Sequence, residues 1–211
     1  HDMQTKRTER QQRFLNLAAI HADDFSTRVA QHDQESSFPY ENVDAMKASG
    51  YTALIVPEEL GGGGASPLDL ALAQERLAYG DLPMAIAINM HHIAVSIIAD
   101  LWWLNQRSEG IKLDAIEPML RSVVKDKIIF GGPVSDPKMN SSLGFAGIND
   151  TTRQAKKVPG GYVITGRSGF GTMSACADYL LTTARYNDPE KGPQCLLCFL
   201  LTCLTLLRDL L

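Results

Sequence analysis

The sequence predicts an α+β fold, in which an N-terminal all-helical domain (residues 4–126) precedes a partial antiparallel β-barrel domain (residues 127–211). Two observations predict this order. Up to about residue 126 the apolar residues recur with a helical period, and from Lys127 onwards short apolar or alternating runs lie between turn residues. A run of helices followed by a run of strands indicates segregated α and β parts rather than a doubly wound sheet.

The helical part is expected to contain five helices. Gly50 occupies the position at which a left-handed residue commonly ends a helix. Ser66, followed by Pro67 and Asp69, predicts a helix start with a hydroxyl cap and a proline in the first turn. The expected helices cover residues 4–31, 40–49, 67–79, 83–104 and 113–125, with Pro118 as the weak point of the last one.

The second part is expected to be built from short strands. Pro159-Gly160-Gly161 predicts a hairpin turn between two of them. The strand candidates are residues 127–134, 146–149, 152–158, 162–165, 178–185 and 196–201. Because a small barrel needs more strands than these to close, we expect a truncated barrel with an open apolar edge, which favours a homo-oligomer.

Composition limits the expected binding partners and indicates a cellular compartment. The net charge of −4 argues against nucleic acid, and we expect neither a membrane span nor a secretion signal. Cys195-x-x-Cys198 is at most half a zinc site, and its setting is not that of a redox dithiol. We therefore expect no metal, and buried free thiols in a reducing cytoplasm.

Two further motifs suggest chemistry that their context does not support. His91-His92 could be a metal ligand pair or a base, but adjacent helical residues point about 100° apart, which favours packed histidines. The run Gly61–Gly64 lacks the lysine and hydroxyl that follow in a phosphate-binding loop, so we reject that interpretation.

The richest candidate site is the run from Gly131 to Ser141, which follows the apolar strand candidate at 128–130. Its glycines allow close approach, and its hydroxyls can hydrogen-bond a planar polar ligand. Further along, Phe170 and Thr172 offer a stacking face and a hydroxyl two residues apart. Plain alternatives exist, because turn hydroxyls often bond their own backbone and strand aromatics often belong to the core.

In order and spacing, these motifs resemble the acyl-CoA dehydrogenase family. The resemblance is carried by Phe38-Pro39 with Gly50 and Val56-Pro57-Glu58-Glu59 with Gly61-Gly62 (FP…G…VPEEYGG), Gln74–Ala78 (E-E-L-A), Ser135-Asp136-Pro137 with Ser141 (T-E-P-x-x-G-S), and Gly161–Gly166 with Phe170 and Thr172 (G-Y-x-L-N-G and the flavin-contacting end of that hairpin). It implies a helical domain followed by a flavin-binding β middle domain and FAD as cofactor. The cofactor-binding residues it implies are Val134, Ser135, Ser141, Phe170 and Thr172.

By the same resemblance, the expected reaction is the α,β-oxidation of an acyl-CoA thioester. Hydride passes to FAD, and an electron acceptor such as an electron-transfer flavoprotein takes the electrons. The family's catalytic glutamate lies in a C-terminal helical bundle that has no counterpart in this sequence, so we assign no catalytic residue. Two alternatives stay open: a flavin-dependent monooxygenase of the same fold, or a catalytically inactive binding or oligomerisation module. Ser168 and Gly171 favour the inactive module, because they stand where lysine and isoleucine are usual.

Overall fold

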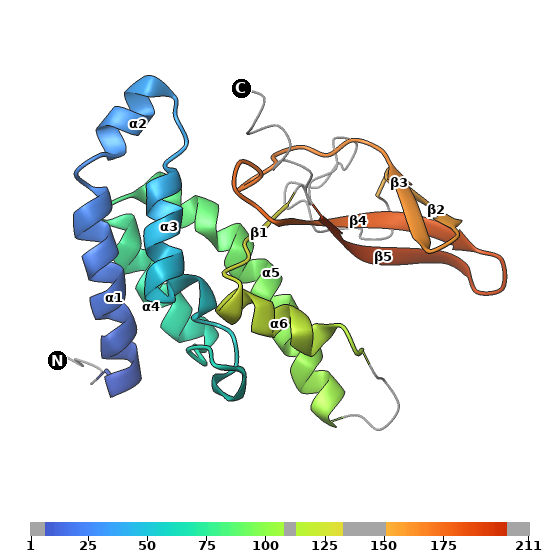
Figure 1. Cartoon of the computed structure of the whole chain (residues 1–211), viewed down its shortest axis with the longest axis horizontal. Coiled ribbons are helices and arrows are strands. Elements are labelled where there is room, and N and C mark those ends of the chain that lie inside the picture. Colours follow the sequence, from blue (N-terminus) through green and yellow to red (C-terminus); the bar gives the residue numbers. More distant parts are fainter. Residues whose placement is uncertain (1–6, 108–112, 133–150, 202–211) are drawn as a thin grey trace, which may run out of the picture. The chain divides into compact units, whose positions relative to one another are not determined.

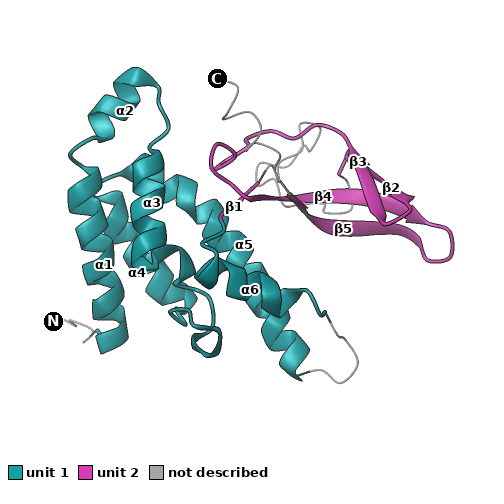
Figure 2. Cartoon of the chain, in the orientation of Figure 1, with its two compact units in different colours: residues 1–128 teal, residues 129–211 magenta. Residues whose placement is uncertain are grey.

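The computed structural model describes residues 7–107, 113–132 and 151–201 (Figure 1). The chain divides into two compact units, a helical unit at residues 1–128 and a sheet unit at residues 129–211 (Figure 2). The class is α+β, as predicted, with helices in the first unit and a sheet in the second. Each unit is described below by itself.

The first predicted helix is two helices. α1 spans Glu9–Phe25 and α2 spans Val29–Glu35. The prediction of one helix over residues 4–31 is wrong because Ser26 and Thr27 bond back to the chain. Their hydroxyls donate to the carbonyls of Asp23 and Asp24, which competes with continuation of the helix.

The next two helices begin and end on the residues that the sequence marks. α3 spans Tyr40–Ser49 and ends at Gly50, whose φ of 81° is left-handed. α4 spans Pro67–Ala78 and starts with a capping box: the Ser66 hydroxyl accepts from the Asp69 N–H, while the Asp69 side chain accepts from the Ser66 N–H. Such a cap stabilises a helix by about 1 kcal/mol.

α5 is the long apolar helix, Leu82–Arg107. It is long and apolar enough to cross a membrane by length and composition alone, and half of its most apolar window is buried inside the structure. α6 spans Ile116–Lys125 and keeps Pro118 in its first turn. The proline does not break the helix, because N–H groups in a first turn have no intrahelical acceptor.

The helical unit has a continuous core. α1 packs against α4, α4 against α5, and α5 against α6 (Figure 1). Tyr51 is fully buried in a short 3-10 helix, Tyr51–Ala53, and its hydroxyl donates to Gln74 Oε1 at 2.7 Å. The largest buried apolar side chains of this unit are Phe25, Met46, Tyr51, Leu77, Ile88, Ile98 and Leu120.

The glycine run after the second 3-10 helix, Glu58–Leu60, folds back on the preceding segment. The N–H groups of Gly62, Gly63 and Gly64 donate to the carbonyls of Pro57, Ala53 and Val56. A Cβ at Gly62 would overlap the backbone of Val56. Close backbone contact therefore explains the run, and these amides are engaged within the chain.

The sheet unit is a mixed, open sheet of five strands: β1 Phe130–Gly131, β2 Gln154–Val158, β3 Gly161–Thr165, β4 Tyr179–Asp188 and β5 Gly192–Leu201. β5 pairs along β4 in antiparallel register, from Asp188↔Gly192 to Tyr179↔Leu201. β1 and β2 pair in parallel with the two ends of the other edge of β4, and β3 pairs with β2 through the predicted turn.

Among the described strands the outer edges of β3 and β5 have no partner, so the sheet is open, as expected of a partial barrel. Two other expectations about this unit need correction. The sheet is not purely antiparallel, because β1 and β2 run parallel to β4. The thiols of Cys176, Cys195 and Cys198 are half-buried rather than buried. The strand candidate at 146–149 and Cys203 lie outside the described residues.

Candidate functional site

The candidate site lies where β1 ends and where the chain between β3 and β4 passes beside it. The Gly132 N–H donates to the Thr172 carbonyl at 3.1 Å, in an isolated antiparallel bridge. A Cβ at Gly131 would come within 2.8 Å of the Thr172 carbonyl oxygen, so glycine permits this approach. The bridge places Gly132, from the first motif of the predicted site, beside Thr172, from the second.

Nearby, the anchor of β1 is a side chain that sequence reasoning did not single out. Asp178 Oδ2 accepts from the Ile129 N–H at 2.7 Å, and the Asp178 N–H donates to the Ile129 carbonyl at 2.8 Å. Phe130 and Ile129 are fully buried. These contacts hold the last residues of β1 beside the start of β4 and so position Gly132.

Phe170 and Thr172 lie in the connection between β3 and β4. Phe170 has a φ of 53° and a side chain that is 84% exposed. Left-handed backbone is unusual for a bulky residue, and such strain concentrates at binding and catalytic sites. The expectation that a strand aromatic belongs to the core is wrong here, because the ring faces away from the protein interior.

Thr172 follows Phe170 by two residues in this connection. Thr172 is half-buried, and its side chain makes no hydrogen bond to any residue that the structure describes. Met173, the next residue, also has a positive φ of 64° but is buried. Left-handed residues therefore stand two positions before Thr172 and directly after it.

Three of the predicted site residues, Val134, Ser135 and Ser141, lie outside the described residues. Their assignment to a cofactor stays a prediction. The structure describes Phe170 and Thr172, together with Gly132, which precedes the other three in the chain.

Arg153 is a buried cation close to this connection and was missed from the sequence. It is 3% exposed. Its Nη1 donates to Ser168 Oγ at 2.6 Å, and its Nε and Nη2 donate to the carbonyl and hydroxyl of Thr183. Ser168, which departs from the family pattern, thus satisfies a buried guanidinium. Sequence gave no signal, because a lone arginine before a strand is ordinarily solvent-exposed.

The histidine pair of α5 is structural, as its spacing predicts. His91 and His92 are fully buried. His91 Nε2 lies 2.8 Å from the Thr52 carbonyl, and burial lowers the pKa of His91 to about 4. Neither ring nitrogen of His92 has a hydrogen-bond partner among the described residues, and burial lowers its pKa well below the usual value. The described residues contain no cluster of three or more metal-ligating side chains.

Comparison with known proteins identifies the family. Residues 8–101 match the family model "Acyl-CoA dehydrogenase, N-terminal domain". The chain is also 31% identical over 182 residues to "Putative acyl-CoA dehydrogenase YdbM" of Bacillus subtilis (strain 168), a match that covers 86% of this chain and 45% of YdbM. Residues 8–101 thus belong to the acyl-CoA dehydrogenase N-terminal domain family, and the chain as a whole is similar to acyl-CoA dehydrogenases.

Solved structures share the fold. A nitrososynthase from Micromonospora carbonacea var. africana is 21% identical with a TM-score of 0.77, over 95% of this chain and 48% of that protein. FMN-bound TdsC from Paenibacillus sp. A11-2 is 23% identical with a TM-score of 0.72, over 90% of this chain and 44% of TdsC. The chain thus spans about half the length of the relatives that it matches.

Proposed function

We propose that this chain supplies the flavin-cradling part of an acyl-CoA-dehydrogenase-like flavoprotein oxidoreductase, with FAD as cofactor. The observation that carries the proposal is the Gly132–Thr172 bridge beside an exposed Phe170 in left-handed backbone. An exposed aromatic ring and a hydroxyl without a hydrogen-bond partner among the described residues, next to glycines that leave room, fit a planar ring system with polar edges.

Different residues would contact different parts of the cofactor. Thr172 would hydrogen-bond a polar edge of the flavin ring, and Phe170 would cover part of its apolar face. Ser135, Val134 and Ser141 are the further contacts expected from the family resemblance. When bound, a flavin accepts hydride from a substrate or, once reduced, activates oxygen. Phe170 and Thr172 would thereby orient the ring.

For the whole reaction we propose oxidation of an acyl-CoA thioester between its α and β carbons, with electrons passing to an acceptor such as an electron-transfer flavoprotein. The family assignment supports this proposal. A flavin-dependent monooxygenase is the second candidate, because TdsC, a dibenzothiophene monooxygenase, and the nitrososynthase share this fold. We also propose a cytoplasmic location and self-association.

Flavin binding is the direct test. The purified chain is titrated into FAD and, separately, FMN, and flavin fluorescence reports binding. Thr172→Ala and Phe170→Ala should each weaken binding about tenfold, the loss expected for one hydrogen bond or one ring contact. Thr165→Ala is the matched control, because Thr165 is an exposed hydroxyl on β3 outside the site. Failure of both flavins to bind contradicts the proposal.

Substrate titration then separates the two reactions. An acyl-CoA thioester that perturbs the visible spectrum of the bound flavin supports the dehydrogenase. A preference for FMN, with no response to thioesters, favours the monooxygenase.

A further inference from the structure

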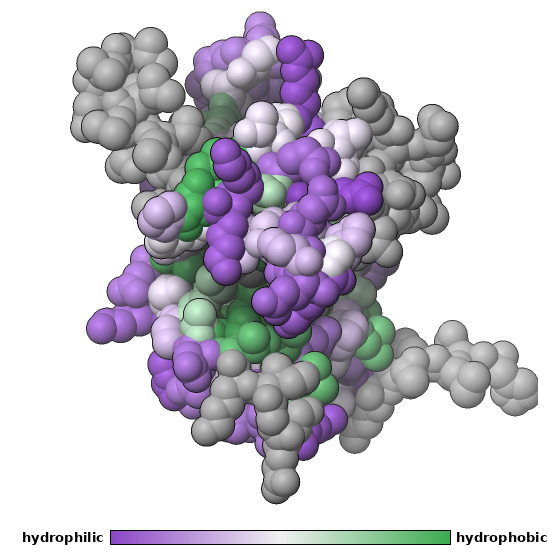
Figure 3. Space-filling view, turned by 90° about the vertical axis from the view of Figure 1, so that its right-hand side faces the viewer, coloured by the Kyte–Doolittle hydropathy of each residue, from purple (hydrophilic) through white to green (hydrophobic). Residues whose placement is uncertain are grey.

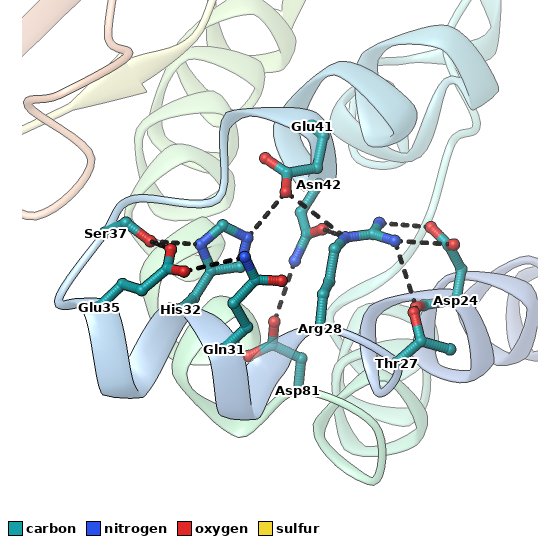
Figure 4. A network of polar contacts seen from close by, with 10 residues as sticks. All are labelled: Asp24, Thr27, Arg28, Gln31, His32, Glu35, Ser37, Glu41, Asn42 and Asp81. Atoms are coloured by element: carbon teal, nitrogen blue, oxygen red, sulfur yellow. Dashed lines mark hydrogen bonds and ion pairs between the residues drawn. The ribbon is translucent and has the colours of Figure 1, made fainter.

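A second cluster of reactive side chains lies in the helical unit, between the end of α2 and the start of α3. His32 stands between Ser37 and Glu41 (Figure 4). Its Nδ1 lies 2.7 Å from Ser37 Oγ, and its Nε2 lies 2.8 Å from Glu41 Oε1. A hydroxyl, an imidazole and a carboxylate joined in this order are the parts of a nucleophilic triad, which is recognised by geometry and not by sequence position.

The surroundings suit the roles of the three groups. Glu41 accepts from its own backbone N–H and from His32, and these contacts lower its pKa, so the carboxylate stays charged. Arg28 Nε lies 3.9 Å from Glu41 and also bonds Asn42, which limits movement of the carboxylate. Ser37 itself is exposed, and its other polar neighbour is Glu35 at 3.5 Å, a long contact.

A cavity opens beside the triad. Its volume is about 530 Å³, within the range of small-molecule sites. Phe38, Pro83 and Met84 are among its apolar lining residues, and its polar lining residues are His32, Asp33, Ser36, Ser37 and Asp81. The apolar part of this lining suits the acyl group of a small ester.

We propose that Ser37, His32 and Glu41 form a hydrolytic site for small carboxylic esters with an apolar acyl group. Ser37 Oγ bonds to the ester carbonyl carbon while His32 Nδ1 takes the hydroxyl proton. The carbon–oxygen bond to the alcohol breaks, and the alcohol leaves with the proton from His32. Water then bonds to the carbonyl carbon of the acyl-serine and gives a proton to His32, the bond from that carbon to Ser37 Oγ breaks, and the carboxylic acid leaves. The proton returns to Ser37, and Glu41 orients the imidazole and stabilises its charged form.

The helical unit offers a natural comparison for this site. His21 Nε2 lies 2.7 Å from Ser49 Oγ, so a serine–histidine contact of the same length occurs there. No carboxylate is hydrogen-bonded to the other nitrogen of His21 in the part of the chain that the structure describes, and His21 is buried. The triad therefore differs from an ordinary serine–histidine contact in two ways: a carboxylate bonds its histidine, and its serine is exposed to solvent.

The first test is hydrolysis of p-nitrophenyl acetate and p-nitrophenyl butyrate by the full chain. Ser37→Ala and His32→Gln should each lower the rate about a hundredfold, and Glu41→Gln about tenfold. Ser49→Ala is the matched control and should leave the rate unchanged. Equal rates for wild type and Ser37→Ala overturn the proposal, and thermal melting of each variant shows whether it folds.

A second test labels the reactive serine directly, in the wild-type chain and in His32→Gln. A fluorophosphonate reacts with activated serines, and peptide mass spectrometry locates the adduct. Attachment to Ser37, and its loss when His32→Gln is used, supports the site. Attachment elsewhere, or none, overturns it. Neither result depends on flavin, so this proposal stands or falls separately from the flavoprotein function.

Discussion

In the helical unit, backbone groups pair within each helix, and capping boxes at Thr8 and Ser66 close two of the helix starts. In the sheet unit, each strand instead depends on a neighbour, and β3 and β5 have outer edges without a described partner. Large apolar side chains reach the surface in both units, and Figure 3 shows hydrophobic residues between hydrophilic ones on one face. The helices of the first unit therefore satisfy most of their backbone hydrogen bonds locally. In the second unit, the backbone groups at the outer edges of β3 and β5 have no described strand to pair with.

The largest expected effect tests how tightly the helical unit is packed. Gly80 follows α4, and a Cβ there would overlap the carbonyl of Ala22 in α1. Gly80→Val should lower the free energy of unfolding by about 3 kcal/mol, because the clash is with backbone. Gly161→Val in β3 is the matched control, since a Cβ there would have no atom of the described residues within 4 Å, its chain neighbours aside. Denaturant unfolding measures both, and equal losses would remove the contrast between the units.

Lowering the pH should also reduce the stability of the helical unit. All five histidines lie between residues 1 and 92, outside the sheet unit. The folded-state pKa of His91 is about 4, below its unfolded value of about 6.5. The unfolded chain therefore binds the proton first, so stability is complete above pH 6.5 and falls towards pH 4, by about 3 kcal/mol for His91.

Denaturant midpoints from pH 7.5 down to pH 4.5, followed by helical circular dichroism, measure this loss. His92→Leu should flatten the pH dependence, because it removes a second buried imidazole whose pKa is lowered in the same direction. A pH dependence that is unchanged in this variant would show that other groups carry the acid response.

A smaller effect concerns the open edge of the sheet unit. β5 carries no charged residue from Gly192 to Leu201, and such edges pair readily with another chain. Leu197 is 43% exposed on this strand. Leu197→Lys should raise the concentration at which the chain associates about tenfold, as measured by light scattering. Ile86→Lys on α5 is the control, and a larger effect there would place association in the helical unit.

The parts of the fold that sequence predicted best are governed by local rules. Gly50 ends α3, and Ser66 with Asp69 starts α4, because caps depend on residues within one turn. The break after Phe25 was missed because serine and threonine tolerate both helix and turn. The parallel pairing of β1 with β4 could not be predicted, since it joins Phe130 to Tyr179 and no local pattern encodes that register.

The candidate site likewise has features that the sequence predicts and features that only the structure reveals. The motifs that contain Phe170 and Thr172 are visible in the sequence, but the exposure of the ring and the bridge to Gly132 are tertiary facts. Arg153 and the Ser37–His32–Glu41 cluster gave no sequence signal. Their partners meet through turns and buried strands, and spacing alone does not distinguish them from surface residues.

The central place of β4 has a consequence for synthesis on the ribosome. Domains generally fold in the order in which they emerge, and the whole helical unit precedes β4 in the chain. β4 is the strand that joins β1, β2 and β5, and it pairs with β1 from Phe130 to Tyr179. The adjoining hydrogen bond from Ile129 to Asp178 joins residues 49 positions apart in the sequence. The nascent sheet therefore has to wait for residues 179–188, with β1 and the β2–β3 hairpin already outside the exit tunnel and exposed to chaperones.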